Sequence, residues 1–233
     1  SAVIEEAYRY FSVITVTGPR QSGKTTLLRN LFSYLPYYSL ENLDVRSFAE
    51  NDPVAFLNQH TEGMILDEVH NAPNLLSYIQ GMVDNDADRR FILSGSSQFA
   101  MLKKVTQSLA GRTAVFELLP LSYSEIREQI TDTPLDNLLF NGFYPAIYSG
   151  RNIPKFLYPA YMKTYLDKDV RDLLQIKDMM QFHTFIRLCA GRIGSLFKAS
   201  ELANEIGVSS HTVTAWLSVL QASYIVFLLP PYF

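Results

Sequence analysis

The chain has 233 residues, of which 48% are hydrophobic and 18% charged, with a net charge of −3. This balance predicts a globular chain and excludes an intrinsically disordered one. A single cysteine, Cys189, excludes a disulfide framework, and its apolar surroundings favour a core position in a protein of the reducing cytoplasm. No apolar run approaches the ~20 residues of a spanning helix, so we expect no membrane association.

The first half of the chain alternates strand-like and helix-like patterns. Helical spacing of apolar residues predicts helices at 3–10, 26–34, 75–83 and 99–109, and the mixed segment 45–60 is expected to be helical around Pro53. Runs rich in apolar and β-branched residues predict strands at 12–17, 37–40, 63–66, 90–93 and 114–118. The alternation predicts an α/β domain with three layers and a parallel sheet.

The second half reads as helical from Ser122 onward. We expect helices at 124–130, 135–141, 155–174, 179–191, 200–206 and 210–221, followed by a strand at 224–229.

A phosphate-binding loop follows the first predicted strand. Its sequence fits G-x-x-x-x-G-K-[ST] at every fixed position, and a predicted helix follows it. Glycines let the backbone N–H groups curl around phosphate oxygens, and the helix N-terminus adds positive charge. Lys24 would bind the β- and γ-phosphates, and the Thr25 hydroxyl would ligate Mg²⁺. The residues predicted to bind ATP are Gly18, Pro19, Arg20, Gln21, Ser22, Gly23, Lys24, Thr25 and Thr26.

Two carboxylates end the apolar strand over 63–66. Because strands of a parallel sheet end at the same edge, Asp67 and Glu68 should lie beside the phosphate loop. Asp67 would hold Mg²⁺ through water, and Glu68 would orient and deprotonate the attacking water. The alternative for Glu68 is a solvated surface acid. Residues 67–70 also spell the D-E-x-H box of helicases, but no second core domain with its own arginines follows.

Two further residues are candidates for the catalytic machinery. Ser94 ends a strand and would sense the γ-phosphate or the water, with Ser96 and Ser97 as rivals. Arg112 would act as an arginine finger on a neighbouring subunit, which requires a homo-oligomer. The alternative for Arg112 is a surface arginine that lies over the sheet edge.

The spacing over 200–221 predicts a helix-turn-helix. Gly207 turns the chain, Ser209 caps the second helix, and Trp216 lies on its apolar stripe. Residues 224–229 would form the first strand of a wing. The second helix carries no lysine or arginine, whereas DNA is bound largely through phosphate neutralisation. We therefore favour packing or docking of a protein partner over DNA binding.

Several segments together resemble a known family, the prokaryotic AAA+-type ATPases often called archaeal-type ATPases, which are close to the signal-transducing NTPases. The segments are GPRQSGKTTLLRNLF, MILDEVHNAPNLLSYIQ, RFILSGSSQF and LAGRTAVFELLPLSYSEI. The second half is similar to the domain of unknown function that accompanies them. The resemblance implies a five-stranded AAA core, a helical region and a winged helix, with Lys24, Thr25, Asp67 and Glu68 as nucleotide residues.

The expected division is an AAA-type ATPase core over 1–121, a helical linker or lid over 122–177 and a winged helix-turn-helix over 178–233. The resemblance also implies a nuclease-like domain beyond this region. The apolar end at Phe233 leads us to expect a chain that stops short of it.

The expected function is a cytoplasmic ATPase that uses ATP and Mg²⁺ as a switch or motor. The alternative is a DNA-binding regulator gated by nucleotide, with little turnover. A nucleotide kinase is set aside because no arginine cluster follows Arg112.

Overall fold

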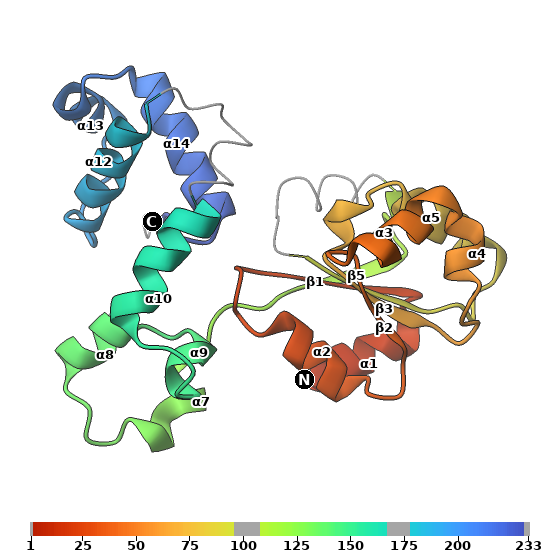
Figure 1. Ribbon diagram of the computed structural model, residues 1–233. Coiled ribbons are helices and arrows are strands. Elements are labelled where there is room, and N and C mark those ends of the chain that lie inside the picture. Colours follow the sequence, from red (N-terminus) through yellow and green to blue (C-terminus); the bar gives the residue numbers. More distant parts are fainter. Residues whose placement is uncertain (1, 96–107, 167–177, 231–233) are drawn as a thin grey trace. The chain divides into compact units, whose positions relative to one another are not determined.

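The computed structural model describes residues 2–95, 108–166 and 178–230 (Figure 1). The chain divides into two compact units, Ser1–Arg151 and Asn152–Phe233. Ser96, Ser97, nearly all of the helix predicted over 99–109 and the end of that predicted over 155–174 lie outside the described residues.

A five-stranded sheet forms the centre of the first unit, in the order β2-β3-β4-β1-β5, and every strand pair is parallel. All residues of β1, β3 and β4 are buried, as continuous apolar runs require when helices cover both faces of a sheet. The strands are β1 Val13–Thr17, β2 Tyr37–Ser39, β3 Met64–Asp67, β4 Phe91–Ser94 and β5 Thr113–Glu117.

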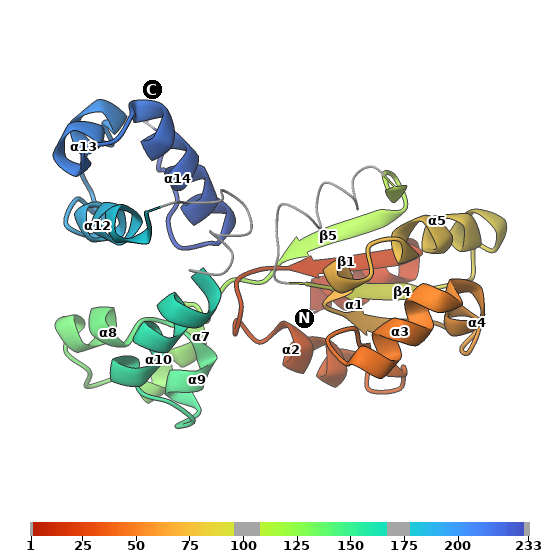
Figure 2. The same ribbon diagram turned by 45° about the horizontal axis from the view of Figure 1, so that its top comes forward.

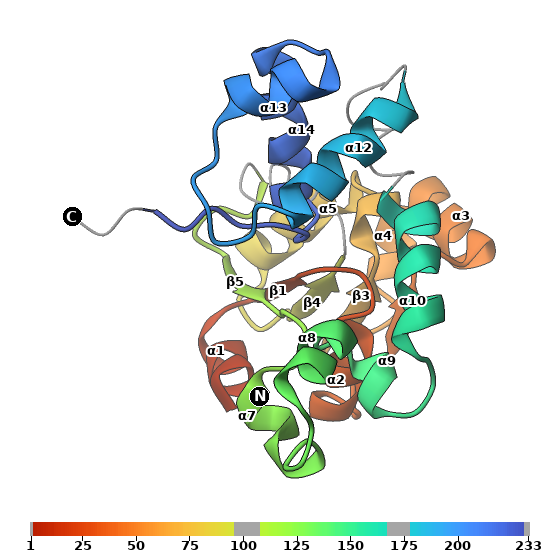
Figure 3. The ribbon, with the colours of Figure 1, turned by 90° about the vertical axis from the view of Figure 1, so that its left-hand side faces the viewer.

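Helices cover both faces of the sheet, which confirms the predicted three-layer α/β fold (Figure 3). One apolar cluster joins the first two helices to Ile14 and Ile92, and another joins the next three to Leu66 and Leu93. The helices on one face are α1 Ala2–Tyr10 and α2 Lys24–Leu31, and those on the other are α3 Leu43–Asn51, α4 Pro53–Leu57 and α5 Leu75–Asn85.

The mixed segment over 45–60, expected to be helical around Pro53, forms two helices, and Pro53 opens the second of them. Asp52 ends α3, and its side chain caps α4 by accepting the Ala55 N–H at 3.0 Å. Pro53 then occupies the first turn of α4, where its missing N–H costs nothing.

A small helical cluster follows the sheet within the first unit. It consists of α7 Tyr123–Ile126, the 3₁₀ turn Arg127–Gln129, α8 Leu135–Asn141 and α9 Pro145–Tyr148. Ile126, Ile130 and Leu138 are buried at its centre. Its first helix begins with a capping box between Ser122 and Glu125.

Three helices of the second unit pack around aromatic residues (Figure 2). Trp216 is 4% exposed, and its ring centroid lies 5.5 Å from that of Phe182, so it is a core residue as predicted. Gly207 turns the chain with φ of 80°. The helices of this unit are α10 Pro154–Tyr161, a π-helical turn Met162–Leu166, α12 Met179–Ala190, α13 Ala199–Ile206 and α14 Ser210–Ala222.

The strand predicted over 224–229 is not formed. A strand needs a neighbour for its backbone hydrogen bonds, and the second unit has no other strand in the part of it that the structure describes. The wing of the predicted winged helix is therefore not confirmed, although the three helices of that module are present. Within the described ranges, no helix has both the length and the apolar character needed to cross a membrane.

Candidate nucleotide site

The turn between β1 and α2 requires glycine at both of its ends. Gly18 has φ of 142°, and a Cβ there would lie 2.1 Å from the Leu118 carbonyl oxygen. Gly23 precedes α2 in the left-handed conformation, with φ of 98°. Residues 18–23 form the loop, and Lys24, Thr25 and Thr26 open the helix. The local sequence therefore curls the backbone as the predicted phosphate loop requires.

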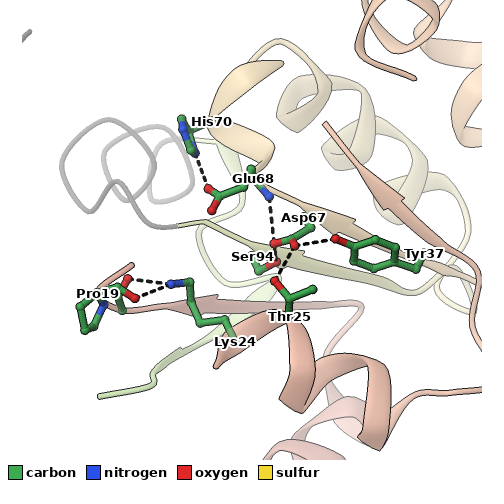
Figure 4. Close-up of polar contacts among 9 residues, drawn as sticks. Pro19, Lys24, Thr25, Tyr37, Asp67, Glu68, His70 and Ser94 are labelled. Carbon is green, nitrogen blue, oxygen red and sulfur yellow. Dashed lines mark hydrogen bonds and ion pairs between the residues drawn. The ribbon is translucent and has the colours of Figure 1, made fainter. Parts of the chain in front are cut away.

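Lys24 is 6% exposed and points back into this loop. Its ammonium donates to the carbonyl oxygens of Gly18 at 3.0 Å and Pro19 at 2.7 Å (Figure 4). Burial lowers the pKa of Lys24, while the carboxylates of Glu68 and Asp67 act in the opposite direction. The site thus places a desolvated amine beside two acids.

Ser22 supplies a buried hydroxyl whose oxygen has no hydrogen-bond partner among the residues that the structure describes. Buried polar atoms are seldom left unpaired in folded proteins. A hydroxyl without a partner in this glycine-bounded loop, two residues before Lys24, fits the oxygen of a phosphate group. The residues present therefore fit the phosphate groups of a nucleoside triphosphate.

The carboxylate of Asp67, at the end of β3, is buried and receives four donors. Thr25 donates to Oδ2 at 2.6 Å, and Tyr37 donates to the same oxygen at 2.7 Å (Figure 4). Ser94 and the Glu68 backbone N–H donate to Oδ1, the latter at 3.1 Å. Thr25 comes from α2, Tyr37 from β2 and Ser94 from β4, so this one carboxylate connects three elements.

Glu68 follows in a left-handed backbone conformation, with φ of 54°. Its carboxylate lies 3.1 Å from Nδ1 of His70, in the 3₁₀ turn Val69–Asn71. The side chain of Glu68 is 16% exposed, so it is not a fully solvated surface acid. Non-glycine residues in this conformation carry strain and gather at functional sites.

The structure brings most predicted catalytic residues together but separates Arg112 from them. Lys24, Thr25, Asp67 and Ser94 meet at the carboxyl ends of the strands. Arg112 precedes the amino end of β5, where Thr113 pairs with Val13, at the other end of the sheet. Its guanidinium pairs there with both carboxylate oxygens of Asp84 in α5.

Sequence reasoning missed Tyr37 and the pairing of His70 with Glu68. The only sequence signal for Tyr37 is a phenol at the start of an edge strand, which strand propensity alone explains. His70 stood in the D-E-x-H pattern, but its contact with Glu68 depends on the 3₁₀ turn.

Comparison with known proteins agrees with this geometry. Residues 10–127 match the AAA_14 family, described as an AAA domain, and residues 132–233 match a domain of unknown function, DUF8612. The whole chain is 29% identical over 242 residues to the uncharacterized protein Rv2008c of Mycobacterium tuberculosis, covering 53% of that protein. It is 23% identical over 247 residues to the uncharacterized protein MJ1544 of Methanocaldococcus jannaschii, covering 55% of it. The chain thus spans about half the length of these relatives.

Among solved structures, the Walker-type ATPase PABY2304 of Pyrococcus abyssi shares the fold, with a TM-score of 0.62 at 14% identity. The match covers 94% of this chain and 87% of that one. The family match covers half of the sequence and includes the phosphate loop and the acidic strand. This chain belongs to the AAA domain family of P-loop ATPases.

Proposed function

We propose that this chain binds ATP with Mg²⁺ between the phosphate loop and the end of β3, and hydrolyses it as a switch or motor. The observation that carries the proposal is the 2.6 Å hydrogen bond between Thr25 and Asp67, with the buried amine of Lys24 beside them. A hydroxyl and an acid from separate elements meet there, as P-loop chemistry requires.

The loop residues would hold the triphosphate. Lys24 would exchange its bonds to the Gly18 and Pro19 carbonyls for bonds to phosphate oxygens, and the unpaired Ser22 hydroxyl would gain a partner. An ammonium makes stronger hydrogen bonds to an anion than to a neutral carbonyl, so the exchange favours binding. Backbone N–H groups at the start of α2 would add further donors.

Thr25 and Asp67 would hold Mg²⁺. The Thr25 hydroxyl donates its hydrogen bond to Asp67, which leaves the lone pairs of the Thr25 oxygen free for a cation. When bound, the cation supplies positive charge to the phosphate oxygens during transfer. The direct donor set, one hydroxyl together with phosphate oxygens and waters, consists of the oxygen ligands that Mg²⁺ prefers, and the Asp67 carboxylate holds that hydroxyl in place.

Glu68 would act as the general base. Its carboxylate would take a proton from the attacking water as the new bond to the γ-phosphorus forms and the bond to the leaving ADP oxygen breaks. The carboxylate lies 3.1 Å from Nδ1 of His70 in the described arrangement. Ser94 stays a predicted sensor, and its observed contact is with Asp67.

The experiment compares nucleotide binding and phosphate release for the wild type, Lys24→Ala and Glu68→Gln. Lys24→Ala should lose binding. Glu68→Gln should keep binding, while turnover falls by about 100-fold or more, as expected for loss of a general base. Equal turnover in all three proteins would contradict the proposal.

For the helices over 178–233 we propose docking of a protein partner rather than DNA. α14 carries no lysine or arginine. Two cations of this region are already paired, Lys198 with Glu201 and Arg192 with Glu205. A titration of duplex DNA binding against salt tests this, because phosphate neutralisation gives a steep slope. A steep slope, together with a change on adding ATP, would favour the nucleotide-gated regulator instead.

A further inference from the structure

Tyr37 reaches the acidic centre of the site from an element that carries none of its predicted residues. It opens β2, the edge strand next to β3, and its hydroxyl donates to Oδ2 of Asp67 at 2.7 Å. The guanidinium carbon of Arg29, in α2, lies 5.0 Å from the centre of its ring. The tyrosine is thus held between the helix that follows the phosphate loop and the strand that carries the acid.

The shared oxygen makes this contact more than packing. Thr25 and Tyr37 both donate to Oδ2, from different elements, while Ser94 and the Glu68 N–H occupy Oδ1. A carboxylate offers about four lone-pair sites, so the four donors fix the carboxylate plane. Without the phenol, Oδ2 would be oriented by Thr25 alone.

We propose that Tyr37 is a positioning residue for the Mg²⁺ site. By fixing Oδ2 of Asp67, it sets the direction of the Thr25 O–H bond and therefore where the Thr25 lone pairs point. Mg²⁺ demands nearly ideal octahedral geometry, so a small rotation of this hydroxyl weakens the site. Tyr37 acts through Asp67 and Thr25, and touches neither metal nor nucleotide. The inference rests on the proposed binding of Mg-ATP.

The test uses the isosteric variant Tyr37→Phe in the full chain. Calorimetry measures the affinity for a non-hydrolysable ATP analogue, with excess Mg²⁺ and with a chelator. In the wild type, Mg²⁺ should raise this affinity. In Tyr37→Phe the metal-free affinity should stay unchanged, while the gain from Mg²⁺ falls by about 10-fold, as for other groups that orient metal ligands. In turnover, the half-saturating Mg²⁺ concentration should rise while kcat at saturating metal stays near that of the wild type.

The neighbouring tyrosine provides the matched control. The hydroxyl of Tyr38 contacts Gln59 and His60, each at 2.8 Å, instead of Asp67. Tyr38→Phe should therefore leave the gain from Mg²⁺ unchanged. Arg29→Gln keeps the Tyr37 phenol but removes the cation over its ring, so it should reduce the gain less than Tyr37→Phe. If Tyr37→Phe does not fold, a gain from Mg²⁺ in Arg29→Gln that is lower than in the wild type supports the proposal, and an unchanged gain overturns it.

The outcomes separate the two proposals. If Mg²⁺ raises the affinity of the wild type and of Tyr37→Phe equally, the role of Tyr37 is overturned and the nucleotide site stands. If folded wild-type protein binds no nucleotide under either condition, the proposed function fails as well.

Discussion

Asp67 shows how the site is specified at the scale of single residues. Its two oxygens accept four hydrogen bonds, two of them from side chains that approach Oδ2 at 2.6 and 2.7 Å. The side chain of Asp67 is 5% exposed, so its oxygens rely on these donors rather than on water. All four neighbouring groups donate, so the side chain at position 67 must act only as an acceptor, as a carboxylate does.

Asp67→Asn should therefore impair the site more than its small change in shape implies. The amide replaces one acceptor oxygen with an NH₂ group that would face two donors. We expect Mg²⁺-dependent nucleotide binding to be lost, and the free energy of unfolding to fall by about 1–3 kcal/mol. Denaturant unfolding and calorimetry measure the two effects. Exposed Asp44 in α3 gives the control, because Asp44→Asn should change neither.

At the scale of elements, a buried arginine secures the end of a helix, near the amino ends of the strands and away from the phosphate loop. Arg89 is 6% exposed and donates to the Leu57 carbonyl at 3.1 Å and to Oδ1 of Asn58 at 2.7 Å. It also donates to the His60 carbonyl at 3.4 Å. A cation at the C-terminus of α4 complements the helix dipole and pairs its last acceptors.

Arg89→Met keeps the apolar stem and removes the donors. Because several buried acceptors lose a partner, we expect the free energy of unfolding to fall by about 2–4 kcal/mol. Nucleotide affinity of the folded fraction should be unchanged. Arg9→Met, at an exposed position of α1, should have little effect on the denaturation midpoint. Equal denaturation midpoints for Arg89→Met and Arg9→Met would show that the hydrogen bonds of Arg89 contribute nothing to stability.

The turn before α14 provides a second prediction at this scale. Ser209 caps the helix by accepting the Thr212 N–H at 3.0 Å. Ser209→Ala should cost about 1 kcal/mol, whereas Ser210→Ala, one residue inside the helix, should cost less. The chain has one tryptophan, and Trp216 lies in the core of these helices, so its fluorescence reports unfolding of this part. Matching transitions for the two variants would contradict the capping role.

At the scale of the whole molecule, the position of Arg112 bears on assembly. It precedes β5 at the sheet edge opposite the phosphate loop, so the length of the strand, ~15 Å, separates it from its own site. It would therefore reach a γ-phosphate only in a second copy. Its pairing with Asp84 holds it near the surface in the described arrangement.

Mixing two inactive variants tests this arrangement. Lys24→Ala should bind no nucleotide, and Arg112→Ala should bind it with much reduced turnover. If the finger acts between copies, the mixture should regain phosphate release, because intact Arg112 of one copy meets the intact loop of the other. A mixture no more active than its parts would leave Arg112 as a surface arginine paired with Asp84.

The sequence by itself determined the phosphate loop, the acidic strand end and the α/β class. Gly18, Gly23, Lys24 and Thr25 lie in one contiguous segment, so their geometry follows from local backbone chemistry. The apolar run before Asp67 likewise identifies a buried strand from its composition alone. These features need no knowledge of which strand lies beside which.

Only the tertiary structure decided the rest. Tyr37 meets Asp67 because β2 lies next to β3, and Arg112 meets Asp84 because β5 begins near the end of α5. Residues 224–229 have the composition of a strand, but no partner strand is described in their unit. Contacts between segments distant in sequence leave no periodic pattern in it, because they depend on strand order and on the availability of hydrogen-bond partners.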